Sequence, residues 1–172
     1  MINANQLREL VIRPTLRHLE PGIPYSEDAV ELLMMTAAHE SHLGTYIAQV
    51  NGPALGIYQM EPATEDDIYD NFLKFKHDLA DNIEVLTNDF YEPVIPELMC
   101  NLAYATAMAR VHYYRVPEAL PTRKAIKHPD QKEEVTLDWI IAMAKYAKKH
   151  YNTELGKATW QQYADAYQRY CL

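Results

Sequence analysis

The sequence is poor in cysteine, in long apolar runs and in basic charge, and each shortage excludes a class of protein. Its two cysteines, Cys100 and Cys171, are too few for the disulfide framework of a small secreted domain. Because they lie far apart in the chain, we favour two free buried thiols over a bridge. No apolar run approaches the roughly 20 residues that span a bilayer, so no membrane insertion is expected.

Basic charge is too sparse for a nucleic-acid-binding protein. The chain carries 16 Lys and Arg against 24 Asp and Glu, a formal net charge of −8, whereas phosphate binding requires clustered basic side chains. The one dense basic run, at residues 145–149, is typical of a solvated helix face. We therefore expect no nucleic acid among the partners.

The N-terminus lacks an apolar stretch long enough for a secretion signal. We therefore expect the protein to be made as a soluble cytoplasmic product, whose export would need another machine. With 172 residues, 48% of them apolar, the chain is long enough to bury one core, which predicts a single globular domain over residues 1–172. Thirteen tyrosines against three phenylalanines are unusual, and tyrosine suits both carbohydrate surfaces and the rim of a core.

Apolar residues recur at helical spacing through most of the chain and no long alternating strand appears, so the predicted fold class is mainly α. The predicted helices cover residues 5–19, 27–42, 74–89, 93–115, 133–150 and 159–170. A further helix is expected to open at Pro62 and Thr64, with Thr64 as its cap. Leu10 is expected on the inward face of the first helix, which Pro14 disturbs. Residues 44–59 are predicted to form a loop or short hairpin, and residues 117–129 a polar connector.

Glu40 stands out by its place on the predicted helix at residues 27–42. The inward stripe of that helix runs at helical spacing through four apolar residues, Val30, Leu33, Met34 and Ala37. Its next members are Glu40 and Ser41, so a carboxylate stands where the pattern predicts an apolar side chain. Apolar surroundings penalise the ionised form of a carboxyl and raise its pKa, as a general acid near neutral pH requires.

Three other interpretations of Glu40 compete with that of a general acid. Near a helix end the side chain could simply reach solvent or pair with a neighbour, since charged residues are rarely buried. The run His39-Glu40-Ser41-His42 resembles a zinc-protease helix, but such a site needs two histidines at i and i+4, and these are three apart. The same pocket could also bind a glycan without cleaving it.

The residues around Glu40 resemble the lysozyme-like lytic transglycosylase family, which includes goose-type lysozyme-like proteins. In that family a helix ends in Glu-Ser, and a loop leads to Gly-Ala-x-Gly-Leu-Met-Gln, an apolar residue, x, Pro, x and Thr. This chain has Glu40-Ser41 and later, from Gly52 to Thr64, the run GPALGIYQMEPAT. Its Gly-Pro-Ala-Leu-Gly segment is one residue longer than the family's, so the loop geometry must differ locally. The resemblance implies a lysozyme-like helical domain with this loop lining an active-site groove.

The resemblance gives roles to individual residues. Glu40 would be the single catalytic acid/base, and Ser41 would either orient it or bond back along its helix. Gln59 offers a donor and an acceptor for sugar amide or hydroxyl groups, or bonds to nearby backbone. Tyr58 would wall the groove or only pack. The glycines would let the backbone pass close to a sugar.

The family's tyrosine partner of the glutamate has no clear counterpart here. In the family it belongs to an Ala-Tyr-Asn-Ala-Gly element, which is not intact in this chain. The nearest candidates are Ala144-Lys145-Tyr146 and His150-Tyr151-Asn152. We choose Tyr146 as the substrate-side tyrosine, because it lies on the inward stripe of its predicted helix.

The resemblance implies an enzyme that cuts peptidoglycan glycan strands between N-acetylmuramic acid and N-acetylglucosamine, with no cofactor and no metal. Glu40 would protonate the bridging oxygen and then act as base on the muramyl 6-hydroxyl, or on water as in a lysozyme. Ordinary glycosidases use two carboxylates, and the nearby Glu61 is expected to face solvent, which favours transglycosylation to a 1,6-anhydro product. The expected setting is a phage-encoded enzyme, an endolysin or a virion component, that acts in the periplasm or cell wall. A non-catalytic virion or glycan-binding protein on the same frame is the alternative.

Overall fold

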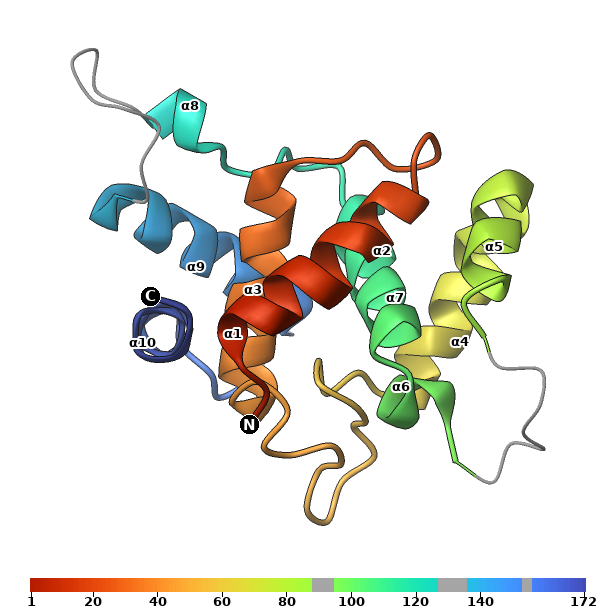
Figure 1. Cartoon of the computed structure of the whole chain (residues 1–172), viewed down its shortest axis with the longest axis horizontal. Helices are drawn as coiled ribbons and strands as arrows, with labels where there is room; N and C mark the ends of the chain where they lie inside the picture. The colour runs from red at the N-terminus through yellow and green to blue at the C-terminus, as the bar shows by residue number, and fades with distance from the viewer. Residues whose placement is uncertain (88–94, 127–135, 153–155) are drawn as a thin grey trace.

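The computed structural model describes residues 1–87, 95–126, 136–152 and 156–172. In these ranges the regular elements are helices, which confirms the mainly α prediction (Figure 1). They are α1 (Ala4–Gln6), the π-helical η1 (Leu7–Ile12), α2 (Arg13–His18), α3 (Glu27–Ser41), α4 (Pro62–Asn71), the 3₁₀ turn η2 (Leu73–Phe75), α5 (His77–Glu84), α6 (Glu97–Cys100), α7 (Leu102–Tyr114), α8 (Arg123–Ile126), α9 (Leu137–Tyr151) and α10 (Trp160–Cys171).

Helix α3 is the element on which the other long helices pack. It contacts α7, α9 and α10, and in Figure 1 it runs through the middle of the molecule. Every residue from Ala29 to Ala38 is buried, so α3 is enclosed around its whole circumference rather than along one stripe. The predicted bounds of this helix are confirmed to within one residue.

Both ends of α3 are fixed by local geometry. Ser26 is the N-cap, and its hydroxyl oxygen accepts a hydrogen bond from the Ala29 N–H at 3.1 Å. At the other end His42 and Leu43 adopt left-handed φ values of 50° and 51°, a conformation that is costly for non-glycine residues and that often marks functional sites. The helix therefore ends directly after Glu40, and the chain turns sharply into the loop.

In the first helical segment, the prediction that Leu10 faces inward was wrong. The chain stays helical through Pro14, but the turns before it widen to π geometry, with the Arg13 N–H bonded to the Arg8 carbonyl. A wider turn relieves the clash between a proline ring and the preceding turn. The widening also changes which residues face inward: Leu7 is buried, whereas Leu10 is 70% exposed.

Two helices around the loop begin or end elsewhere than predicted. Helix α4 starts at Pro62 with Glu61 as its N-cap, because proline at the first helical position has its φ already set. The prediction of Thr64 as the cap was wrong. The helix predicted at residues 74–89 is shorter: η2 precedes α5, which ends at Glu84, and residues 88–89 lie outside the described part.

The later helices follow their capping residues. The predicted helix at 93–115 is broken at Asn101, whose side-chain oxygen accepts from the Tyr104 N–H at 3.0 Å and so starts α7. Thr136 caps α9 and Thr159 caps α10, the latter with a full capping box. Residues 93–94 and 133–135 lie outside the described part. The connector at 117–129 contains α8, and residues 127–129 are likewise outside it.

The segment at residues 44–59 is a loop with hairpin character, as predicted. Two isolated antiparallel bridges, Ala48 to Leu55 and Leu55 to Met60, hold it together. Gly56 has a φ of 72°, and a Cβ there would meet the Leu98 carbonyl oxygen at 1.7 Å. This glycine is therefore required for the loop to pack on α6, and its expected close approach to a sugar is replaced by a close approach to the protein's own backbone.

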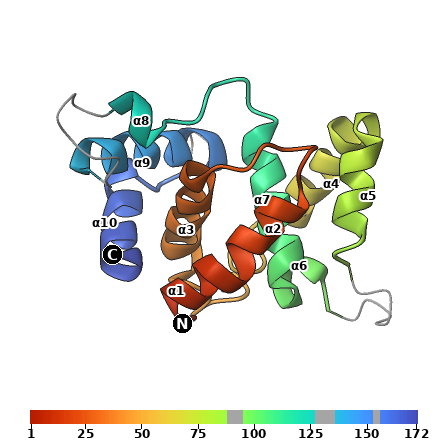
Figure 2. The ribbon, with the colours of Figure 1, turned by 45° about the horizontal axis from the view of Figure 1, so that its top comes forward.

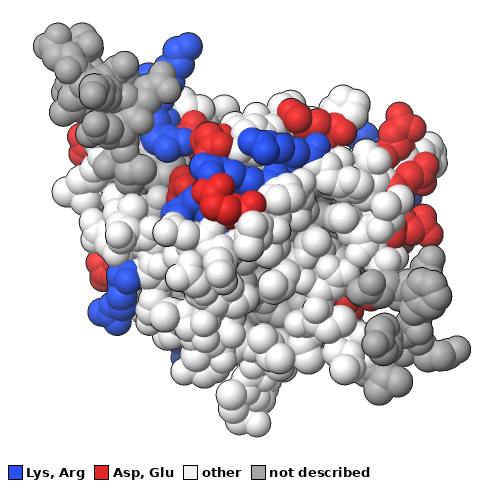
Figure 3. All heavy atoms as spheres, viewed as in Figure 1, with Lys and Arg blue, Asp and Glu red and all other residues white. Residues whose placement is uncertain are grey.

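The buried apolar side chains form one cluster, to which all the long helices contribute. Figure 2 shows α9 and α10 on one side of α3, with α4 and α5 beyond α7 on the other. On the face drawn in Figure 3, acidic and basic side chains mix along the upper edge, while most of the remaining surface is uncharged. Cys100 and Cys171 are both free thiols, as expected, but only Cys171 is buried. The prediction of a buried Cys100 was wrong, because it lies at the exposed end of the short helix α6. Within the described ranges, no helix has the length and apolarity to cross a membrane.

Candidate active site

Glu40 lies in the last turn of α3 and is held by two donors from the C-terminal part of the chain. Its Oε1 accepts a hydrogen bond from the Tyr163 hydroxyl at 2.6 Å and another from the Asn152 side-chain amide at 3.0 Å. Only 16% of the side chain is exposed. Among the described residues none donates to Oε2, so the second carboxyl oxygen is free to carry a proton.

Burial raises the pKa of Glu40 to about 7. The hydrogen bonds from Tyr163 and Asn152 and the charge of Lys148 act in the opposite direction, but burial outweighs them. A carboxyl with this pKa is partly protonated at neutral pH. It can both donate a proton and take one back, which is what a single acid/base has to do.

His39 adds no positive charge to the site. Its Nε2 lies 4.0 Å from Glu40 Oε1, but burial lowers the pKa of His39 to about 4, so the ring is neutral at pH 7. The ring stacks on Tyr163 with centroids 3.8 Å apart, while His42 stacks on Tyr170. Tyr163 and Tyr170 are seven residues apart on α10, about 10 Å at 1.5 Å per residue, so the two histidines serve separate aromatic contacts.

Tyrosines supply the low-dielectric wall around Glu40. Tyr113 and Tyr151 pack with ring centroids 5.3 Å apart, and burial followed by the nearby Glu40 charge raises the pKa of Tyr151. Their hydroxyls are used inside the protein: Tyr151 donates to a backbone carbonyl and Tyr113 bonds Thr36 at 2.8 Å. The excess of tyrosine over phenylalanine therefore builds a packed wall with paired polar tips.

A cleft of about 200 Å³ opens in front of this wall. It is lined by Glu40, Gln59, Met60, Glu61, Thr64, His112, Tyr151 and Asn152. The lining comes from α3, the loop, the start of α4, α7 and the end of α9. The loop and the glutamate that the sequence linked thus share one cavity. In the described part of the chain no three His, Cys, Asp or Glu side chains gather as a metal site would require.

Gln59 lines the cleft, whereas Ser41 is buried behind it. Gln59 lines the cleft in a left-handed conformation, φ 47°, and its amide nitrogen donates to the Gly56 carbonyl at 2.8 Å. Ser41 is fully buried: its hydroxyl donates to the Ile57 carbonyl at 2.6 Å and accepts from the Gly44 N–H at 2.9 Å. Ser41 therefore ties the loop to the end of α3 and bonds back along its helix to Ala37, one of the two alternatives given for it.

Tyr58 and Tyr146 do not reach the cleft. Tyr58 is 1% exposed and its hydroxyl bonds Thr106 at 3.2 Å, so it packs in the core, the second of its two alternatives. The choice of Tyr146 as the partner of Glu40 was wrong, because its hydroxyl donates to the Glu118 carbonyl and its ring stacks on Tyr113. The hydroxyl that bonds Glu40 belongs to Tyr163 instead.

Three further site residues were missed or ranked second. Tyr151 and Asn152, from the candidate not chosen, both line the cleft. His112 also lines it, and burial lowers its pKa to about 4, so it is a neutral ring whose Nε2 lies 3.0 Å from the His150 carbonyl. The sequence did offer a signal for His112, because a histidine on the inward face of the predicted helix at residues 93–115 is a candidate site residue.

The arrangement is a partly protonated carboxyl at the end of a buried helix, two neutral hydrogen-bond donors on one of its oxygens, and a cleft beside it. Glu61 is exposed, as expected, but it also lines the cleft. Comparisons of the chain with family models, with curated proteins and with solved structures found no match. Inference of function therefore rests on the site itself.

Proposed function

We propose that this protein cleaves peptidoglycan glycan strands between N-acetylmuramic acid and N-acetylglucosamine, with Glu40 as the single acid/base, and gives 1,6-anhydro products. The observation that supports the proposal most is the carboxyl of Glu40, whose pKa is raised to about 7 at the edge of a cleft that also contains Gln59. This is the protonation behaviour that glycosidic bond cleavage requires of its acid. The resemblance of the segment from Glu40 to Thr64 to lytic transglycosylases points to the same chemistry.

In the proposed reaction the proton on Oε2 of Glu40 passes to the bridging oxygen as the bond to the anomeric carbon breaks. The sugar left behind develops oxocarbenium character, and Glu40 becomes a carboxylate. Tyr163 and Asn152 donate to its Oε1 and so stabilise the charge as it forms. The carboxylate then takes the proton of the muramyl 6-hydroxyl, whose oxygen bonds to the anomeric carbon and closes the anhydro ring.

Hydrolysis is the second candidate, and Glu61 is the observation that favours it. Inverting glycosidases use a second carboxylate to activate a water, and Glu61 lines the same cleft as Glu40. The two reactions leave different ends, anhydromuramyl or reducing. A Glu61→Gln variant should keep nearly full activity if the enzyme is a transglycosylase and lose most of it if Glu61 acts as the base.

The test is digestion of purified sacculi followed by mass spectrometry of the released fragments. The wild type is compared with Glu40→Gln and with Glu84→Gln, a matched change at an exposed glutamate on α5. Anhydromuropeptides from the wild type and Glu84→Gln, and none from Glu40→Gln, are the expected result. Reducing ends in their place would establish the hydrolase. If no preparation releases fragments, the protein is not such an enzyme and a glycan-binding role on this frame becomes the alternative.

A further inference from the structure

A second hollow lies next to the cleft of Glu40. Helices α9 and α10 pack against each other at a steep angle: in Figure 1 α10 is seen nearly end-on, whereas α9 runs across the page. A hollow of about 300 Å³ opens between the end of α9 and the start of α10. It is lined by Lys145, Lys148, Lys149, Asn152 and Trp160. Asn152 also lines the cleft and donates to Glu40. The two depressions therefore meet at one residue, and a chain-like ligand could occupy both.

The lysines of the hollow share one face of α9, because residues three and four apart are neighbours on a helix. The sequence suggested only a solvated helix face, but these side chains line the same hollow as Trp160. The Lys145 ammonium lies 5.3 Å from the ring centroid, a cation–π contact. Lys149 pairs with Glu118, and Lys148 donates to the Gly156 carbonyl at 3.1 Å.

The hollow is locally basic in a protein with a net charge of −8. Three of the described residues that line it are lysines and none of those described is acidic, and in the described ranges no carboxylate pairs with Lys145. The positive charge of Lys148 reaches as far as Glu40, since it is one of the influences on that carboxyl. An anion bound in the hollow would thus lie within electrostatic reach of the proposed catalytic group.

We propose that this hollow is a subsite for a sugar that carries a carboxylate. The partly exposed indole of Trp160 offers apolar contact to a sugar ring, and Lys145, which lies over that indole, supplies an ammonium group for the carboxylate. The inference rests on the proposed function and narrows its substrate class. The glycan entering the cleft carries a negative charge next to the cleaved bond, on the lactyl group of N-acetylmuramic acid or on its peptide stem.

Binding measured without turnover tests the subsite. In the Glu40→Gln background, calorimetry compares a muramyl tetrasaccharide with peptide stems, the same glycan with the stems removed, and chitotetraose, which has no carboxylate. Lys145→Gln should weaken both muramyl ligands by about threefold and Lys145→Glu by about tenfold, as expected for one solvent-accessible charge contact. Lys145→Arg should restore binding. Chitotetraose should bind equally to all variants, and Lys124→Gln on α8 is the matched control.

The outcomes separate the subsite from the proposed function. The lactyl carboxyl is a free carboxylate only where the stem has been removed, because the stem is attached to it as an amide. Weakening of the stem-free glycan therefore assigns the lactyl carboxylate, weakening of the stem-bearing ligand assigns a carboxylate of the stem, and weakening of both shows that the subsite accepts either. If all three glycans bind with equal affinity, or if the Lys145 variants bind the muramyl ligands as tightly as the parent protein, the subsite proposal is wrong. This conclusion holds even if sacculi are cleaved through Glu40. If sacculi stay intact while Lys145-dependent muramyl binding persists, the subsite stands on a binding protein and the catalytic proposal fails.

Discussion

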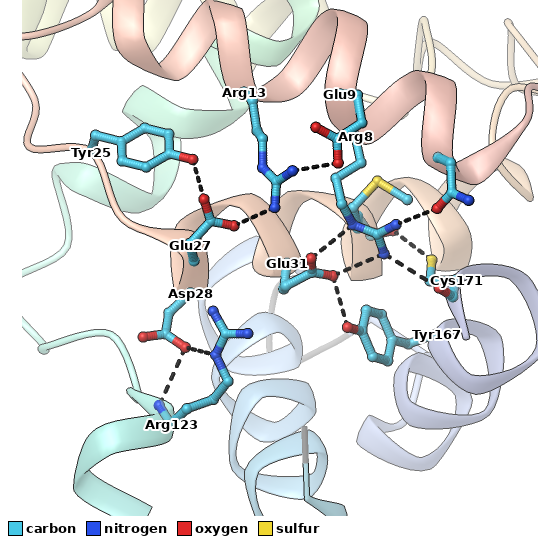
Figure 4. A network of polar contacts seen from close by, with 12 residues as sticks. Arg8, Glu9, Arg13, Tyr25, Glu27, Asp28, Glu31, Arg123, Tyr167 and Cys171 are labelled. Atoms are coloured by element: carbon cyan, nitrogen blue, oxygen red, sulfur yellow. Dashed lines mark hydrogen bonds and ion pairs between the residues drawn. The ribbon is translucent and has the colours of Figure 1, made fainter. Parts of the chain in front are cut away.

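Helix α3 holds two buried carboxyls that meet opposite electrostatic surroundings. Glu31, 6% exposed, receives two hydrogen bonds from the Arg8 guanidinium at 2.8 and 3.2 Å and one from the Tyr167 hydroxyl at 2.7 Å (Figure 4). Glu40 likewise receives a tyrosine hydroxyl from α10, that of Tyr163, but its second donor is the neutral amide of Asn152. One carboxyl is paired with a cation in the protein interior, whereas none of the described residues that line the cleft of the other is a lysine or arginine.

The difference teaches what makes a buried carboxyl structural or reactive. At Glu31 the partner is the Arg8 guanidinium. Burial lowers the pKa of Arg8, but the hydrogen bonds and charge of Glu31 outweigh burial and raise that pKa overall. At Glu40 burial prevails and the proton is retained up to about pH 7. Tyrosines four residues apart on α10 donate to both carboxyls, so the difference between the two sites lies in the second partner, a guanidinium at Glu31 and a neutral amide at Glu40.

The largest expected effect is on turnover. If Glu40 is the acid/base, Glu40→Gln should reduce cleavage of sacculi by about 10²- to 10⁴-fold, the usual contribution of a general acid. Glu31→Gln should keep the turnover per folded molecule, because Glu31 has its bonds inside the protein. Release of soluble fragments, normalised to folded protein by circular dichroism, measures both. If both variants lost the same fraction of turnover per folded molecule, Glu40 would have no catalytic role that Glu31 lacks.

Stability should show the reverse pattern. Glu31→Gln leaves the buried Arg8 charge without its partner and should lower the free energy of unfolding by about 3 kcal/mol. Glu9→Gln, at a pair with Arg13 in which Glu9 is 51% exposed, should cost less than about 1 kcal/mol. Urea unfolding at pH 7 gives both values. A loss at Glu31 no larger than at Glu9 would mean that the buried pair contributes nothing.

The pH dependence of stability should identify Glu40 separately. Its folded pKa, about 7, lies above the unfolded value of 4.5, so its contribution is fully present below pH 4.5 and is lost as pH rises through 7. Relative to Glu40→Gln, the wild type should lose about 3 kcal/mol across this window, at 1.36 kcal/mol per pKa unit. The lowered pKa values of His39 and His112, each about 4, act in the opposite direction. They are common to both proteins and cancel in the difference, and parallel unfolding curves at every pH would refute the raised pKa.

The smallest expected effect is a shift in the pH profile of kcat/KM, which should distinguish Tyr163 from Tyr167. Tyr163→Phe removes a hydrogen bond that lowers the pKa of Glu40, so the upper limb of the pH profile of kcat/KM should move to higher pH by about one unit. Tyr167→Phe removes the bond to Glu31 and should leave the profile where it is. A shift caused by Tyr167→Phe, or none by Tyr163→Phe, would show that the two hydroxyls do not serve separate carboxyls.

The sequence was sufficient for the helical class and the bounds of α3, because these depend on local periodicity and capping. The joining of Glu40 with the loop through Gln59 came from the resemblance to a known family. The partners of Glu40 were not predictable in this way. Asn152 and Tyr163 are 112 and 123 residues away in the chain and meet it only through the packing of α9 and α10 on α3. Tyr146 does point inward from α9, but toward Tyr113. Periodicity gives the inward face of a helix and not the neighbour that it meets.

The protonation of Glu40 can be observed directly by carbon-detected NMR. The side-chain carboxyl resonance of Glu40, assigned by its absence in Glu40→Gln, is followed from pH 3 to 9 in the wild-type protein. We predict a titration midpoint near 7, as burial against the tyrosine wall requires. A midpoint at or below the ordinary value of about 4.5 would mean that Glu40 is ionised at neutral pH, and it would then be unfit for the role of acid.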